Sequence, residues 1–199
     1  MPTTLTEHAD RLNLRCAQRN DLPAVILVTD GQRLADPVAA LGKLRPGDAV
    51  LLRHYDAPHR VELARALAVA CRARRIRLIV GGDSRLARAV GAQGIHVPQG
   101  LVTRASGLRH NGFLVTAAAH DWAGLIGAYR AGVDAILLSP VFATASHPGA
   151  PHLGVHRFAA WVRRSPVPVY ALGGVTATTA GRLTGSGAVG IAAVGAFTS

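Results

Sequence analysis

Eight short apolar runs, separated by stretches with helical periodicity, constrain the fold of this 199-residue chain most strongly. The runs are apolar along their whole length instead of at alternate positions, which is typical of parallel strands covered on both faces. They span residues 24–30, 49–53, 77–81, 94–97, 113–118, 135–139, 167–172 and 189–194. Eight strands with helices between them predict an α/β fold, a (β/α)₈ TIM barrel near the lower size limit. An open doubly wound sheet is the alternative, although it usually carries five or six strands.

The clearest of the intervening helices is predicted over residues 60–75, where apolar side chains recur at close to 3.6-residue spacing. Further helices are predicted over 37–44, 85–90, 122–131, 155–164 and 178–183. Asp83 and Asp121 stand directly before two of them, where N-caps belong. No linker interrupts the pattern, so residues 1–199 are interpreted as a single domain, with an N-terminal helix in 1–20 and a barrel over 24–197.

The chain offers too few residues after the eighth strand for an eighth helix. A helix is instead predicted over residues 5–19, where Leu5, Ala9, Leu12 and Cys16 lie three or four positions apart. In a closed barrel the outer face of strands eight and one needs an apolar cover. We expect this extra N-terminal helix to provide it, and a second copy in a homodimer is the rival cover.

Composition excludes several classes of protein. The longest apolar stretches fall far below the roughly 18–20 residues of a membrane span, and no secretory signal is visible. Two cysteines form no disulfide framework and indicate free thiols in a reducing compartment, so we expect a cytoplasmic protein without a membrane partner. The net charge of +11 attracts phosphates, but the arginines are dispersed and aromatics make up only 5%, so no nucleic-acid partner is expected.

Two glycine-bearing turns follow the last two strands. Gly173 and Gly174 come after strand seven, and Val194 and Gly195 come after strand eight. TIM barrels often bind phosphate through backbone N–H groups at these two loops, and glycine lets the phosphate approach closely. Tight turns without a ligand are the other interpretation.

Histidines are the best candidates for acid/base chemistry. His96 closes strand four, His120 closes strand five, and His147 lies in the long loop after strand six, all at the expected mouth. Ser139 and Thr144 could hydrogen-bond a ligand there. Each histidine could equally be structural or solvated, and no histidine spacing typical of a metal site occurs.

Five motifs occur in an order that resembles the thiamine phosphate synthase/TenI-like superfamily. They are Val28-Thr29-Asp30, Gly94-Ile95-His96-Val97-Pro98-Gln99, Thr116-Ala117-Ala118-Ala119-His120, Ser139-Pro140-Val141-Phe142-Ala143-Thr144 with Pro148-Gly149-Ala150, and Leu172-Gly173-Gly174-Val175. The resemblance spans nearly the whole chain. It implies a barrel whose partner is a small molecule, phosphorylated hydroxyethylthiazole. The synthase branch joins this to an aminopyrimidine pyrophosphate with Mg²⁺, whereas the TenI-like branch isomerises it between tautomers without metal.

The resemblance and the place of these residues at the expected mouth together predict a set of site residues. Substrate and phosphate are expected at Thr29, Arg53, His96, Gln99, Thr144, Gly173, Gly174, Val194 and Gly195, and catalysis at His120, His147 and Ser139.

Several positions depart from the synthase pattern. Where the synthases carry Gln, Lys, Asn, Asp and Asp, this chain has Leu51, Tyr55, Gly81, Gly82 and Leu101. A lysine of the family's long loop is replaced by His147. Because Mg²⁺ prefers carboxylate oxygens, no metal residue is assigned, and Mg²⁺ is expected only if synthase activity is retained. Pro140 stands where the TenI-like branch carries its catalytic histidine. A tautomerase-like enzyme, a divergent synthase and a non-catalytic thiamine-phosphate-binding or regulatory barrel therefore all remain as interpretations.

Overall fold

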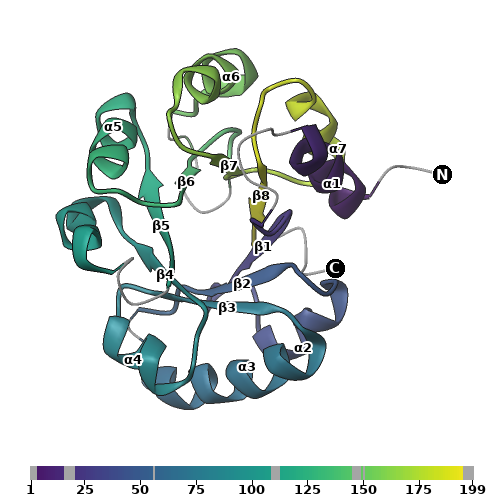
Figure 1. Ribbon diagram of the computed structural model, residues 1–199. Coiled ribbons are helices and arrows are strands. Elements are labelled where there is room, and N and C mark those ends of the chain that lie inside the picture. Colours follow the sequence, from purple (N-terminus) through teal and green to yellow (C-terminus); the bar gives the residue numbers. More distant parts are fainter. Residues whose placement is uncertain are drawn as a thin grey trace.

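A computed structural model describes residues 4–15, 21–55, 57–108, 113–144, 149 and 151–194 of the chain. Its parallel strands pair in sequence order and close into a barrel, with β8 returning to β1, so the TIM barrel is confirmed (Figure 1). The strands are β1 (Val25–Val28), β2 (Ala49–Leu52), β3 (Arg77–Gly81), β4 (Gly94–Val97), β5 (Leu114–Ala119), β6 (Ala135–Leu138), β7 (Val169–Leu172) and β8 (Gly190–Ala193). Each strand lies where an apolar run predicts it, and its first and last residues differ from the predicted ones by at most two positions.

Helices surround the barrel as expected (Figure 1). They are α1 (Leu5–Arg15), α2 (Pro37–Ala40), α3 (Arg60–Arg74), α4 (Ser84–Ala89), α5 (Trp122–Arg130), α6 (Gly154–Arg164) and α7 (Ala177–Ala180), with 3₁₀ turns η1 (Leu41–Lys43), η2 (Gln99–Gly107) and η4 (Gly181–Leu183). Asp83 and Asp121 cap α4 and α5 through their carboxylates, as predicted. The 3₁₀ helix η2 was not predicted, because its apolar residues do not recur at the 3.6-residue spacing of an α-helix. None of the described helices is long and apolar enough to span a membrane.

Two apolar layers explain why the strands are apolar throughout. One face of each strand packs in the barrel interior, where Ile26, Leu51, Ile79 and Leu137 meet around the fully buried ring of Tyr170. The opposite face packs against the surrounding helices. Because both faces are buried, most polar residues of the barrel lie near the strand ends, and the exception, Thr116 within β5, is hydrogen-bonded.

The helix α1 occupies the seat that the sequence assigns to it. It packs against β8, β1 and α7 (Figure 1). Leu5, Ala9 and Leu12 are buried there. The Asn13 side chain donates to the Val189 carbonyl at 3.0 Å and to the Leu22 carbonyl at 3.3 Å, which ties the helix to the start of the barrel. Cys16, the last position of the predicted stripe, lies outside the described residues.

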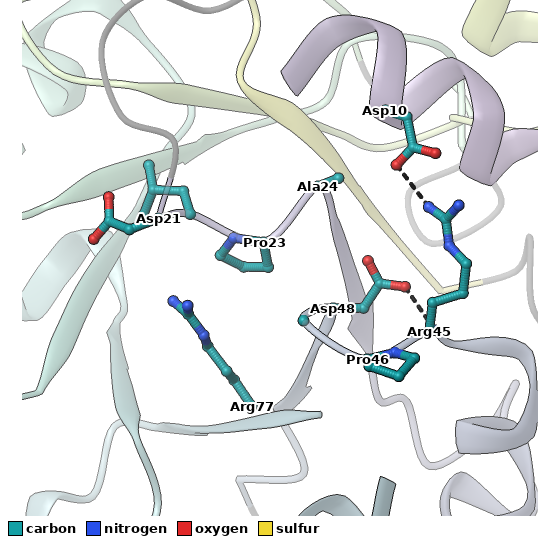
Figure 2. A pocket seen from close by; sticks show the side chains of 10 residues that line it. Asp10, Asp21, Pro23, Ala24, Arg45, Pro46, Asp48 and Arg77 are labelled. Carbon is teal, nitrogen blue, oxygen red and sulfur yellow. Dashed lines mark hydrogen bonds and ion pairs between the residues drawn. The ribbon is translucent and has the colours of Figure 1, made fainter. Parts of the chain in front are cut away.

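A cavity of about 400 Å³ opens at the N-terminal end of β1, β2 and β3 (Figure 2). Three of its charged side chains are engaged by the protein: Arg45 pairs with Asp10 at 2.6 Å, and the buried Asp48 accepts the Arg45 backbone N–H at 2.8 Å. Burial raises the pKa of Asp48 above its ordinary value. These contacts fasten the loop before β2 to α1, so we interpret this end of the barrel as structural.

Candidate functional site

The carboxyl ends of β4 and β5 place a neutral histidine inside the mouth of the barrel. His96 Nδ1 lies 2.9 Å from Thr116 Oγ1, and that hydroxyl lies 3.4 Å from the Ile95 carbonyl oxygen. The hydroxyl has one proton, which it donates either to the Ile95 carbonyl or to Nδ1, so these contacts hold the imidazole in place in either tautomer. Burial lowers the pKa of His96 to about 3, so the ring stays uncharged near neutral pH.

A second histidine is oriented at the same mouth by the end of β6. His120 Nδ1 lies 3.1 Å from both the carbonyl oxygen and the hydroxyl of Ser139. The carbonyl oxygen accepts from a protonated Nδ1, and the hydroxyl can donate to an unprotonated one, so the two contacts hold the ring in place in either tautomer. His120 is exposed, whereas Ser139 is buried. The pair has the arrangement of a positioned acid/base with its orienting group.

Gln99 contacts His120 from the end of β4. Its side-chain Oε1 accepts the backbone N–H of His120 at 2.7 Å, and its Nε2 donates to Asp121 Oδ2 at 3.5 Å. Both ends of the carboxamide are thus engaged by the protein. This position is expected to bind substrate, and the structure shows that its carboxamide also contacts other residues of the site.

The ends of β1 and β2 carry a network of charges. Asp30 Oδ2 accepts from Arg33 and from Arg53, each at 2.8 Å. The hydrogen bond from Arg33, with the nearby charge of Arg53, lowers the pKa of Asp30 to about 2. Thr29 is buried and accepts the backbone N–H of Arg53 at 3.0 Å, and its hydroxyl lies 2.9 Å from His54 Nδ1. Arg53 is thereby held with its guanidinium 34% exposed at the mouth.

The end of β3 is covered by an aromatic ring. A side chain at Gly81 would meet the Tyr55 ring at 3.0 Å, and one at Gly82 would meet it at 3.2 Å. Arg60 lies over the same ring, 5.8 Å from its centre, and donates to the Gly81 carbonyl. Tyr55 and Arg60 therefore fill the space in which longer side chains would stand.

The residues around this ring do not fit a Mg²⁺ site. The nearby carboxylate, Asp83, accepts two backbone N–H groups of α4 and lies 3.7 Å from Arg60. Leu101 packs against the outer apolar layer. Among the described residues, no three His, Cys, Asp or Glu side chains gather as a metal site would require. The positions that the resemblance places at a metal thus carry glycine or an apolar side chain, and the nearby carboxylate is engaged by the protein.

The turn after β7 faces the same mouth. Gly173 and Gly174 have φ values of +91° and +64°, which favour glycine, and the turn is half-buried. A side chain at Gly173 would lie 2.8 Å from the Pro140 Cα, so this turn packs directly on the segment after Ser139. Within the described residues, neither glycine has a hydrogen-bond acceptor for its backbone N–H. Two free N–H groups next to the His120–Ser139 pair suit an oxyanion.

The remaining expected site residues are placed only in part. Thr144 is half-buried at the end of the described β6 loop, and Val194 is buried in the barrel interior directly after β8. His147 and Gly195 lie outside the described residues.

Comparison with known proteins supports the family that the motifs suggest. The family model described as thiamine monophosphate synthase matches residues 25–197. The chain belongs to this family. A putative thiamine-phosphate synthase 2 of Aquifex aeolicus is 31% identical over 183 residues, which cover 89% of this chain and 98% of the relative. A thiamine-phosphate synthase of Rhizobium etli is 37% identical over 153 residues, 73% of this chain and 74% of the relative.

A solved structure confirms the fold of this thiamine monophosphate synthase family member. The thiamine phosphate pyrophosphorylase from Pyrococcus furiosus superposes with a TM-score of 0.75 at 23% identity, and covers 88% of this chain and 86% of that one. At this identity the likeness carries the fold alone.

Sequence reasoning missed two features of the site. The stacking of Arg60 on Tyr55 links residues five apart across a loop and a helix start, and no local pattern indicates it. The salt bridge from Arg33 to Asp30 was also missed, although an Asp with an Arg three residues later in a loop is a usable signal.

Proposed function

We propose that this protein is an enzyme of thiamine biosynthesis that binds hydroxyethylthiazole phosphate and moves a proton on it, in the manner of a thiazole tautomerase. The observation that carries the proposal is the His120–Ser139 pair, which lies beside the Gly173–Gly174 turn and whose imidazole Nε2 has no hydrogen-bond partner within the part of the chain that the structure describes. In this mechanism the free N–H groups of the turn hold the phosphate.

The proton transfer needs no group other than His120. In the tautomer with Nδ1 protonated, its Nε2 accepts one proton from the ligand, and the resulting imidazolium returns that proton to a second atom of the ligand, so His120 ends as it began and atoms and charge balance. In this mechanism the Ser139 carbonyl accepts from Nδ1 and holds the ring in one orientation. His96, which is neutral, can share a hydrogen bond with the ligand deeper in the barrel.

A divergent thiamine phosphate synthase is the second candidate, and the names of the similar proteins favour it. Its Mg²⁺-dependent pyrophosphate chemistry would need carboxylates that the β3 end does not offer, because Tyr55 covers Gly81 and Gly82 there. A barrel that binds thiamine-related phosphates without chemistry is the third. We propose a cytoplasmic location and no nucleic-acid or membrane partner for any of them, with a homodimer still open.

Calorimetric titration tests the phosphate site and separates the synthase from the other two candidates. Hydroxyethylthiazole phosphate and the dephosphorylated alcohol are each titrated into the protein, with and without Mg²⁺ and inorganic pyrophosphate. We expect at least tenfold tighter binding of the phosphate, unchanged by Mg²⁺ and pyrophosphate. Equal affinity for phosphate and alcohol would refute the phosphate turn. A strict requirement for Mg²⁺ would favour the synthase.

A further inference from the structure

The contacts of Gln99 reach beyond its own strand, to the loop that carries His120 and to the first turn of α5. Its Oε1 accepts the His120 backbone N–H at 2.7 Å. Its Nε2 donates to Asp121, whose other carboxylate oxygen accepts the Gly124 N–H at 2.6 Å and so caps α5. One carboxamide therefore joins the end of β4, the histidine and the start of the following helix.

The carboxamide lies directly on the surface of Gly124. A Cβ at this position would come within 2.7 Å of Gln99 Oε1 and 2.8 Å of Nε2. Gly124 has no positive φ, so its backbone does not require glycine. The space that Gln99 occupies is the feature that requires it.

We infer that Gln99 is a positioning residue for His120, and that Gly124 is a glycine so that Gln99 can hold this place. The inference rests on the proposed role of His120 as the acid/base. His120 is fixed at two points: Gln99 holds its backbone N–H, and Ser139 holds its ring Nδ1. Releasing the first contact lets the loop after β5 shift and turns the ring away from the Ser139 carbonyl.

Two substitutions release the contact by independent routes. Gln99→Met keeps the length of the side chain and removes the acceptor. Gly124→Ala keeps Gln99 but displaces its flexible end, which leaves the fold intact. The matched control is Gly127→Ala on the same helix, where a new methyl group meets only Val102 Cγ1 at an ordinary 3.8 Å. Gln99→Glu retains an acceptor oxygen for His120 but sets a carboxylate against Asp121, so the rescue variant combines it with Asp121→Asn, which restores a donor at that contact.

The experiment reads the contact and the chemistry separately. Amide hydrogen exchange of His120 and the ¹⁵N shifts of its ring report the contact and the tautomer without substrate. We expect Gln99→Met and Gly124→Ala to speed exchange of the His120 amide about fivefold or more and to raise the Nε2–H tautomer. Their kcat for proton exchange into hydroxyethylthiazole phosphate should fall about 10- to 100-fold, with KM changed less than about threefold. Gly127→Ala should match the wild type, and the Gln99→Glu/Asp121→Asn double variant should recover most of the kcat that Gln99→Met loses.

Two results would overturn the inference. If the His120 amide and tautomer are unchanged in Gln99→Met and Gly124→Ala, Gln99 does not position the histidine. If they change while kcat stays at the wild-type value, the contact has no part in the reaction. A wild-type protein without any turnover contradicts the proposed function instead, and the exchange data then decide the contact alone.

Discussion

Replacing Leu12 by alanine tests whether α1 is an integral part of the barrel. Leu12 is 5% exposed and lies in the layer between α1 and the β8–β1 pair. Removing a buried leucine side chain costs about 2–5 kcal/mol, and a helix near the chain terminus can settle into the space, so we expect about 2–3 kcal/mol. For a domain of this size that lowers the melting temperature by about 5–10 °C.

Leu14 on the same helix provides the matched control. Its side chain is 84% exposed, so Leu14→Ala removes an equal number of atoms with little loss of burial. Both variants are compared with the wild type by differential scanning calorimetry and urea unfolding. Leu14→Ala should lie within about 0.5 kcal/mol of the wild type. Equal losses in the two variants, or no loss in Leu12→Ala, would show that α1 does not cover the barrel.

Three further predictions concern charge, packing and reactivity. Because the folded pKa of Asp30 is about 2 against 3.8 ordinarily, its charge stabilises the fold above about pH 4. This contribution, about 1–2 kcal/mol after solvent screening, should be lost between pH 4 and pH 2 in urea titrations of the wild type but not of Asp30→Asn. Gly174→Ala should cost about 1–3 kcal/mol more than Gly185→Ala by urea unfolding, because both have positive φ but only the first meets neighbouring backbone; equal costs would contradict this. The thiol of Cys71 is 1% exposed, and burial raises its pKa to about 12, so iodoacetamide should modify it in a Cys16→Ser background only after unfolding. Rapid modification of the native protein would show that the thiol is reached from solvent.

The strands could be predicted because burial on both faces leaves a plain signal in the sequence. For the shortest helices, the apolar pattern predicts where a helix lies but not which type of helix it is. The segments predicted over 37–44 and 178–183 each split into one α-turn and one 3₁₀ turn. Such short segments bury too few side chains to show a period.

The site could be predicted in its location and only partly in its contacts. His96 lies near the end of β4, and His120 and Ser139 directly follow β5 and β6. The barrel fold therefore brings all three to one mouth, as the sequence indicates. The role of Gln99 could not be predicted, because its partner Gly124 lies 25 positions later and the contact depends on how α5 packs. The cover of Gly81 by Tyr55 depends likewise on a loop conformation between different strands.

Deuterium uptake from D₂O into hydroxyethylthiazole phosphate tests the central claim most directly. The measurement follows the ligand by NMR with wild-type protein, with His120→Gln, and with His8→Gln on α1 as the control, all in excess chelator. The account predicts catalysed uptake by the wild type and by His8→Gln, and a rate at least about 100-fold lower in His120→Gln. No uptake with the wild type, or an equal rate in His120→Gln, would contradict it.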